Sequence, residues 1–458
     1  MPLHTLALLL AACTSGDDTA EDTSGGTPDE VPDLPTGGCG GPGWSWVPLA
    51  GMGAIVAAEE DEGLHLTAAF IQSIVDAMAG GASPLEIRYG VRTWRVRYVT
   101  QDRGVATEAT LLAVLPDVTE TTSFPAVMWG HGTSGFTDAC APSAAGFEGA
   151  AGPLLVASLG FAVAAPDYLG MAGFGEPSGC LHPYLVPEAT AVASLDAVRA
   201  LTALATQEGT PAVPDLDRLV PWGASEGGFA ALWTDRYAGG YAPEMTVVAT
   251  VAAVPPLGLT ALAAWGLTHL GQTSRSIAAA AVTQHPWYGG PGGLADLLTD
   301  APPRYVASTL PAEMAETCSD FPSIADAGLE EIFQPAVLAA AEAGDMDALQ
   351  PWGCYQAQGD LASSAIPRGG DAPVLVILSE LDTWVVSDVV RGELPLLCDE
   401  GYVIEHIECA GASHSEGAIQ SLPYQADWAR ARLEGDPLDP GIVCTITEPQ
   451  DCTELRGR

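Results

Sequence analysis

The sequence predicts an α/β protein with a mostly parallel central sheet, flanking helices and a large helical insertion. Apolar runs of strand length alternate with helical segments along most of the chain. This alternation is typical of parallel strands that are buried on both faces. The second observation is an interval between two late strands that is too long for a loop. The chain has 458 residues, of which 48% are hydrophobic, so it can bury a large core.

The elements follow in order from the sequence pattern. Residues 93–100 and 107–114 are strand-like and flank "QDRG", which predicts a hairpin. The remaining expected elements are strand 124–132, helix 150–160, strand 161–168, helix 187–205, strand 217–225, helix 226–239, strand 246–254, strand 372–379, strand 402–408 and helix 425–434.

The predicted insertion covers about residues 255–371. It contains "PPLGLTALAAWGLTHL", "SIAAAAVTQHPWYGG" and "PAVLAAAEAGDMDALQPWG", which indicate short helices broken by Pro and Gly. Residues 245–274 are uncharged, so a membrane span is an alternative. Because Pro255 and Pro256 split this stretch and the remainder is too short to span, we expect helices of a folded domain.

The charge balance excludes one class of partner. There are 58 acidic residues against 16 basic ones, which gives a net charge of -42, and every fixed cation is an arginine. Such a chain offers no basic surface that could displace counterions from a polyanion, so no nucleic-acid partner is expected.

The N-terminus resembles a bacterial lipoprotein signal. A short apolar run ends in Leu10-Ala11-Ala12-Cys13, which matches the box where the signal peptide is cut and the cysteine acylated. We therefore expect a signal peptide at 1–12, a lipid anchor on Cys13 and, because Thr14 follows, sorting to the outer membrane. The run before the box has His4 but no Lys or Arg, so an unprocessed apolar N-terminus is the alternative.

Residues 13–40 form the second predicted unit, and residues 41–458 the third, a folded domain that carries the insertion. The stretch from Thr14 to Pro35 is acidic and rich in Gly, Ser, Thr and Pro. It cannot bury enough apolar area to fold, so it predicts a solvated tether. Its acidic residues lack the spacing of a calcium loop.

The cysteines fit an oxidising compartment. Nine remain after Cys13, with neither C-x-x-C nor zinc-ligand spacing. Sequence does not fix their connectivity. Nearness along the chain suggests four pairs and leaves Cys39 over; these pairs are Cys398 with Cys409, Cys444 with Cys452, Cys140 with Cys180, and Cys318 with Cys354.

Ser225 is the candidate nucleophile. It stands in "GASEGG" between an apolar strand and a helical segment, the context of a strand-to-helix elbow. Gly223 and Gly227 lack the Cβ atoms that would clash where strand and helix approach. A serine that only caps the following helix is the alternative.

His414 and Asp382 are the candidate base and acid. On such a sheet the chain order is serine, acid, histidine, and His414 lies in "GASHSEG", a loop after the last predicted strand. His406 lies inside that strand, so we expect it to be packed. Asp382 follows the preceding strand directly, and Glu380 is the reserve.

The loop "GHGTSG" after an early strand is the candidate source of an oxyanion hole. The amide of Glu226, next after the serine, would supply one hydrogen bond, and Gly132 or Thr133 the other. His131 precedes these residues and is expected to orient the loop. The predicted chemistry needs no metal and no organic cofactor.

Together these motifs resemble the α/β-hydrolase superfamily, and within it the secretory lipase family that includes fungal lipase A-type enzymes. The resemblance runs from about Thr93 to Glu434 and is most specific in "GHGTSG", "APDYLGMAG", "GASEGG", "SELDTWVV" and "GASHSEG". It implies the roles already assigned to Ser225, Asp382 and His414, and it implies that the insertion is a lid or cap over the active site. A proline common after the acid's valines is replaced here by Ser387.

The predicted function is therefore hydrolysis of carboxylic esters through an acyl-enzyme, with acylglycerols or related apolar esters as substrates. An acyltransferase or a serine peptidase on the same scaffold is one alternative, since the triad does not choose the acyl acceptor. An inactive surface lipoprotein used for binding is another. The apolar helices of the insertion, with Trp265 and Leu267 as candidates, are expected to line an acyl tunnel or to form the insertion's own core.

Overall fold

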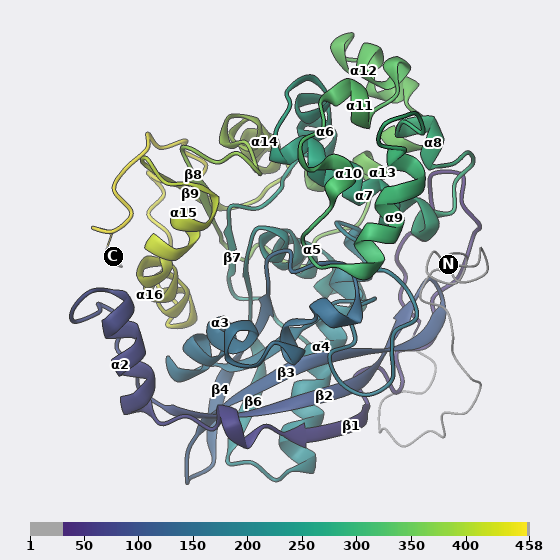
Figure 1. Cartoon of the computed structure of the whole chain (residues 1–458). Helices are drawn as coiled ribbons and strands as arrows, with labels where there is room; N and C mark the ends of the chain where they lie inside the picture. The colour runs from purple at the N-terminus through teal and green to yellow at the C-terminus, as the bar shows by residue number, and fades with distance from the viewer. Residues whose placement is uncertain (1–30, 456–458) are drawn as a thin grey trace.

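The computed structural model describes residues 31–455. The predicted signal peptide, Cys13 and most of the predicted tether therefore lie outside the described residues. Within them the strands form one sheet of nine (Figure 1). The strands are β1 (Ile55–Glu60), β2 (Gly90–Asp102), β3 (Val105–Asp117), β4 (Thr122–Gly130), β5 (Ala162–Pro166), β6 (Ala212–Ala224), β7 (Thr250–Ala253), β8 (Val374–Ser379) and β9 (Ile404–Cys409).

The sheet is mostly parallel, as the sequence predicts. Its strand order is β1-β2-β3-β5-β4-β6-β7-β8-β9. Every pair from β5 to β9 is parallel, whereas β1, β2 and β3 join the edge antiparallel. Each predicted strand is present, although β7 is shorter than expected. The edge strand β1 was not predicted; four of its six residues are partly covered and two are exposed, without the regular alternation of a half-buried strand.

Helices cover both faces of the sheet, and the strands alternate between two cores. Along β4, Val127 packs in the core that includes Leu154 of α3, whereas Ala126 and Met128 pack in the core that includes Phe229 of α5. This period of two is what a strand buried on both faces requires. The helices outside the insertion are α2 (Ala68–Met78), α3 (Gly146–Ser158), α4 (Pro187–Gln207), α5 (Glu226–Tyr241), α14 (Ser387–Asp399), α15 (His414–Gln420) and α16 (Leu422–Leu433).

The segment between β7 and β8 is helical and stands beyond one end of the sheet, at the top of Figure 1. No helix in residues 31–455 has both the length and the apolar character needed to cross a membrane. The uncharged stretch 245–274 instead supplies β7, one complete helix and the start of a second. The helices of the segment are α6 (Leu259–Thr268), α7 (Gln272–Tyr288), α8 (Leu294–Leu297), α9 (Val306–Glu316), α10 (Pro322–Ala325), α11 (Leu329–Ile332), α12 (Pro335–Glu342) and α13 (Trp352–Gln358).

The disulfide pairs suggested by nearness along the chain are wrong. The structure has Cys39–Cys354, Cys140–Cys318, Cys398–Cys444 and Cys409–Cys452. The first two join residues 315 and 178 positions apart. Pairing depends on which Cβ atoms the fold brings face to face, and sequence distance does not report that. Both long-range bonds attach the helical segment to other parts of the chain.

Candidate active site

Ser225 occupies a sharp turn between β6, which ends at Ala224, and α5, which begins at Glu226. Its backbone has a φ of 58° and a ψ of −124°, a conformation that L-residues rarely adopt. Such strain costs about 1–3 kcal/mol and persists only where the surroundings enforce it. Here the Ser225 amide donates to the carbonyl oxygen of Ala253 at 2.8 Å, which attaches the turn to the neighbouring strand β7.

The glycines that flank the turn are required by space, as predicted. A Cβ on Gly223 would stand 2.3 Å from the carbonyl oxygen of Gly227. A Cβ on Gly227 would stand 2.0 Å from the carbonyl oxygen of Gly130, at the end of β4. The ends of β4 and β6 therefore contact the first turn of α5 through backbone atoms alone. The Ser225 side chain is left at the end of the sheet.

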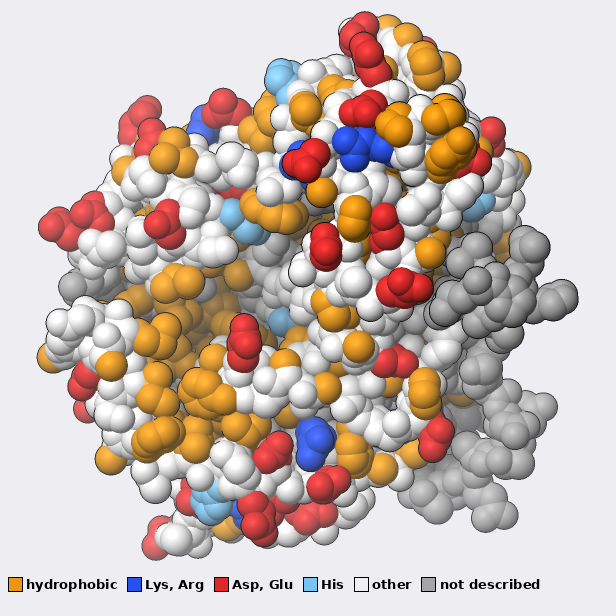
Figure 2. All heavy atoms as spheres, viewed as in Figure 1, with side chains coloured by type: hydrophobic (Ala, Val, Ile, Leu, Met, Phe, Trp, Pro, Cys, Tyr) orange, Lys and Arg blue, Asp and Glu red, His pale blue; other side chains and the backbone are white. Residues whose placement is uncertain are grey.

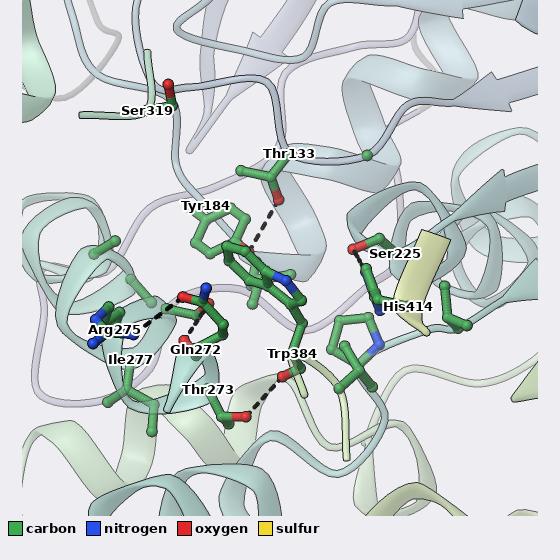
Figure 3. A pocket seen from close by; sticks show the side chains of 18 of the residues that line it. Thr133, Tyr184, Ser225, Gln272, Thr273, Arg275, Ile277, Ser319, Trp384 and His414 are labelled. Carbon is green, nitrogen blue, oxygen red and sulfur yellow. Dashed lines mark hydrogen bonds between the residues drawn. The ribbon is translucent and has the colours of Figure 1, made fainter. Parts of the chain in front are cut away.

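The structure brings Ser225, His414 and Asp382 together. The Nε2 atom of His414 lies 2.8 Å from Ser225 Oγ, and its Nδ1 atom lies 2.6 Å from Asp382 Oδ2. Figure 3 shows the Ser225 and His414 side chains pointing toward one another at one side of the cavity. A carboxylate that accepts from Nδ1 leaves Nε2 free to accept the serine proton.

Each partner is held by its own local structure. His414 is the first residue of α15, after the cap residue Ser413, which forms a capping box with Glu416. The Asp382 carboxylate accepts from the amides of Trp384 and Val385 through Oδ1, both at 2.9 Å, which leaves Oδ2 for His414. The three side chains are therefore fixed before any substrate arrives.

The alternative residues lie elsewhere. Glu380 accepts from the amide of Gly411 at 2.7 Å, on the outside of the loop. His406 is buried in β9, where its Nδ1 atom accepts from the amide of Thr447 at 3.1 Å. Burial, with a smaller effect of Arg391, lowers the pKa of His406 to about 4, so it is neutral and packed, as expected.

The loop after β4 lies beside the serine. A Cβ on Gly132 would stand 3.7 Å from the Cβ of Ser225, and Gly132 and Thr133 both line the cavity there. Glu226 begins α5, so its amide belongs to the unpaired N-terminal turn of a helix, where negative charge is stabilised. The roles of these three residues as oxyanion donors remain predictions.

Tyr168 holds this loop in place through His131, and Asp167 fixes the segment that carries Tyr168. The ring of Tyr168 stacks on His131 with centroids 4.2 Å apart, and Tyr168 Oη donates to the His131 carbonyl oxygen at 3.0 Å. Asp167 is buried and accepts from Thr110 Oγ1 at 2.6 Å and from the amide of Ser143 at 2.8 Å. Burial raises the pKa of its carboxyl. Asp167 thus fixes the segment after β5 to Thr110 and Ser143, and it supports the loop through its neighbour Tyr168.

A cavity of about 1180 Å³ opens at Ser225. Its walls come from α6, α7, the loop around Phe321 and the rim residues Trp384 and Ile419. Figure 3 shows Gln272, Arg275 and Ile277 of α7 on the side opposite Ser225. Arg275 Nε donates to the carbonyl oxygen of Ile324 at 3.1 Å, which links α7 to α10.

Trp265 and Leu267 do not line this cavity. Leu267 is buried, and Trp265 stacks on His269 with centroids 4.5 Å apart. Both belong to the packing of α6 itself, and it is Leu262 and Ala263 of the same helix that face the cavity. Helical periodicity alone cannot tell which apolar face turns to a cavity and which to a core.

Sequence reasoning assigned no role to His182 and only a backbone role to Glu226. In the structure His182 Nε2 lies 2.6 Å from Glu226 Oε1, and both side chains are almost fully buried. The two residues are 44 positions apart in the sequence. The only sequence signal for this contact is that Glu226 directly follows Ser225. Within residues 31–455, no group of three or more His, Cys, Asp or Glu side chains could hold a metal ion.

Comparison with known proteins supports the same picture. Residues 151–267 match the secretory lipase family, a segment that contains Ser225 but neither Asp382 nor His414. No curated protein sequence matches the chain.

Solved structures are similar over most of the chain. The rice cell wall degrading esterase LipA from Xanthomonas oryzae is 18% identical, with 84% of this chain and 100% of that chain covered and a TM-score of 0.65. A putative hydrolase from Legionella pneumophila is 19% identical, with coverages of 84% and 100% and a TM-score of 0.68. Candida antarctica lipase A is 14% identical, with coverages of 88% and 87% and a TM-score of 0.61. The chain therefore has the α/β-hydrolase fold that its sequence predicts.

Proposed function

We propose that the chain is a serine carboxylic-ester hydrolase of the lipase and esterase type. The observation that carries the proposal is the hydrogen-bonded series Ser225, His414 and Asp382 at a strained strand-to-helix turn. The match of residues 151–267 to the secretory lipase family supports ester hydrolysis as the chemistry. Geometry and family match are independent, because the matched segment contains only the first of the three residues.

The proposed reaction uses each of these groups in turn. Ser225 Oγ attacks the ester carbonyl carbon while His414 Nε2 takes the hydroxyl proton, and Asp382 stabilises the imidazolium that forms. The carbonyl oxygen becomes an oxyanion that receives hydrogen bonds from the amide of Glu226 and from the loop at Gly132 and Thr133. His414 then gives its proton to the leaving alcohol, and water repeats the sequence on the acyl-enzyme.

The substrates that fit the site are apolar esters. Leu262, Ile277 and Phe321 line the cavity, so an acyl chain would lose its contact with water there. Figure 2 shows hydrophobic side chains gathered around a hollow near α3, α15 and α16. Of the cavity's rim residues, Trp384 is 46% exposed and Ile419 is 63% exposed, which favours an apolar substrate at the opening.

The experiment that tests the proposal is labelling with a fluorophosphonate, which reacts only with an activated serine. We expect one label on Ser225, loss of the label in Ser225→Ala, and turnover of nitrophenyl esters by the wild-type protein only. Transfer of the acyl group to an added alcohol or amine in preference to water would favour an acyltransferase. A folded wild-type protein that takes up no label would contradict the proposal and favour a binding role.

The proposed location is outside the cytoplasm. The disulfides and the match to a secretory family support export. We further propose that Cys13 carries a lipid anchor in the outer membrane, which is the expectation from the lipobox. Mass spectrometry of the mature N-terminus tests this. A diacylglyceryl group on Cys13 would support it, and a Cys13 without lipid, or an uncut Met1, would contradict it.

A further inference from the structure

The Glu226 side chain has one strong partner. Its Oε1 atom lies 2.6 Å from His182 Nε2. The other ring nitrogen of His182, Nδ1, lies 2.8 Å from the carbonyl oxygen of Leu169. A carbonyl only accepts, so Nδ1 carries a proton. The contact with Glu226 then holds one more proton, either on the imidazole or on the carboxyl, and the pair is electrically neutral in both cases.

The second oxygen of this carboxyl has no partner of its own. Glu226 Oε2 is fully buried, and no group in residues 31–455 is placed to hydrogen-bond it. A buried carboxylate without such bonds depends on its one counter-charge. Glu226 therefore relies on His182 for its compensation.

Through two tyrosines, His182 also reaches the other half of the predicted oxyanion hole, the loop at 131–133. Its ring stacks on Tyr168 with centroids 5.4 Å apart and meets the edge of Tyr184 at 6.3 Å. Tyr168 Oη donates to the carbonyl oxygen of His131, and Tyr184 Oη accepts from Thr133 Oγ1 at 3.1 Å. The start of α5 and the loop at 131–133 thus meet on one buried histidine.

The ionisable groups around His182 and Glu226 begin with the two tyrosines. Burial raises the pKa of Tyr168 and of Tyr184, and the negative charge of Glu226 raises both further. The other ionisable groups around the serine are His131 on the β4 loop and the His414–Asp382 pair, and Glu148, Asp320 and Arg275 line the walls of its cavity. Arg275 is the fixed cation among them, and it donates to the Ile324 carbonyl oxygen and to Gln272. Among the described residues, His182 is therefore the group that contacts the Glu226 carboxyl and can neutralise it.

We propose that His182 and Glu226 are a positioning pair for the oxyanion hole. The pair fixes the two segments that carry the donor amides, and it keeps the net charge of the two buried side chains at zero. The inference rests on the proposed ester hydrolysis. A negative charge develops on the substrate oxygen close to the amide of Glu226, where the surroundings are apolar and Coulomb interactions are strong. An uncompensated carboxylate on that same residue would repel the oxyanion.

Three variants separate position from charge. His182→Phe keeps an aromatic ring between the tyrosines and leaves the Glu226 carboxyl without its partner. Glu226→Gln keeps the shape and removes the charge. The double variant removes both. Glu405→Gln is the matched control. Glu405 is also a buried carboxyl, and it accepts from Tyr424 Oη and, at 2.8 Å, from Trp428 Nε1. It does not line the cavity.

In His182→Phe we expect kcat for nitrophenyl butyrate to fall about 10²-fold, as when an oxyanion donor is lost, with KM nearly unchanged. In Glu226→Gln the loss should be about tenfold, the equivalent of one ordinary hydrogen bond. The double variant should recover about tenfold over His182→Phe, because the unpaired charge is gone. Glu405→Gln should lower stability and leave kcat as it is.

The pH profile gives a second readout that a structural role would not change. In His182→Phe the buried Glu226 carboxyl has lost its partner, so the loss of its proton at higher pH leaves an uncompensated charge beside the oxyanion. The kcat of this variant should therefore show an added fall with rising pH that is absent in the double variant. His182→Gln leaves the same charge uncompensated and replaces His182→Phe should that variant not fold.

Different results would contradict the proposed function and the positioning pair. A wild-type protein without fluorophosphonate labelling would contradict the proposed function. A wild-type protein that is labelled, together with a double variant no faster than His182→Phe and no added pH limb, would contradict the positioning pair alone.

Discussion

Gly130 and Gly227 are in direct backbone contact, since a Cβ on Gly227 would stand 2.0 Å from the carbonyl oxygen of Gly130. This contact joins the end of β4, from which the oxyanion loop leaves, to the first turn of α5, which begins after the serine. The oxyanion loop and the first turn of α5 are therefore fixed relative to each other by backbone contact, with no side chain between them that could adjust.

The first prediction is that Gly227→Ala is damaging out of proportion to its size. The added methyl group meets backbone, which cannot rotate away, so we expect about 1–3 kcal/mol or more of lost stability and loss of activity. Gly392→Ala is the control. Gly392 lies in α14 with nothing near its Cβ position, so this change should stabilise by about 0.5–1 kcal/mol. Urea unfolding of both variants measures the difference.

The second prediction distinguishes two histidines in adjacent elements. His414→Ala should lower kcat for nitrophenyl esters by about 10³-fold or more, because Ser225 loses its base. His406→Ala should keep kcat and lose stability, because that side chain is neutral and packed in β9. Steady-state kinetics on both purified variants decide the matter, and the reverse pattern would show that the base is misassigned.

The fold and the three candidate catalytic residues could be predicted because their signals are local. Apolar runs mark the central strands, and the order of serine, acid and histidine after β6, β8 and β9 leaves few candidates. The disulfides, the contact of His182 with Glu226 and the choice of Leu262 over Leu267 as a cavity wall could not be predicted. Each depends on which residues the complete fold brings face to face, and no local pattern encodes that.

The third prediction concerns Glu188, a buried carboxyl in the first turn of α4. Burial raises its pKa well above the ordinary value, Asp102 raises it further, and Arg103 opposes the shift. A carboxyl with a raised folded-state pKa contributes stability that is complete below its unfolded pKa and is lost as pH rises through the folded value. Wild-type stability should therefore fall with rising pH more steeply than that of Glu188→Gln.

Urea unfolding from roughly pH 5 to 8 tests this dependence. The exposed Glu330 supplies the control, since Glu330→Gln removes the same charge at the surface. Parallel curves for the wild type and Glu188→Gln would mean that Glu188 is not the group responsible.

The last prediction concerns the acyl site and uses two leucines of one helix. Leu262 and Leu267 are both buried in α6, but only Leu262 lines the cavity. Each methylene of a bound acyl chain that leaves water adds about 0.8 kcal/mol, so kcat/KM should rise from acetate through the medium-chain esters until the cavity is full.

Leu262→Trp should shorten the cavity, lower kcat/KM for palmitate and leave kcat/KM for acetate unchanged. Leu267→Ala should cost about 2–5 kcal/mol of stability and leave the chain-length profile as it is, because the cavity it creates lies in the helix packing. A wild-type kcat/KM that falls steadily from acetate onward would instead mean that the enzyme acts on small esters, and that these leucines serve the packing of α6 alone.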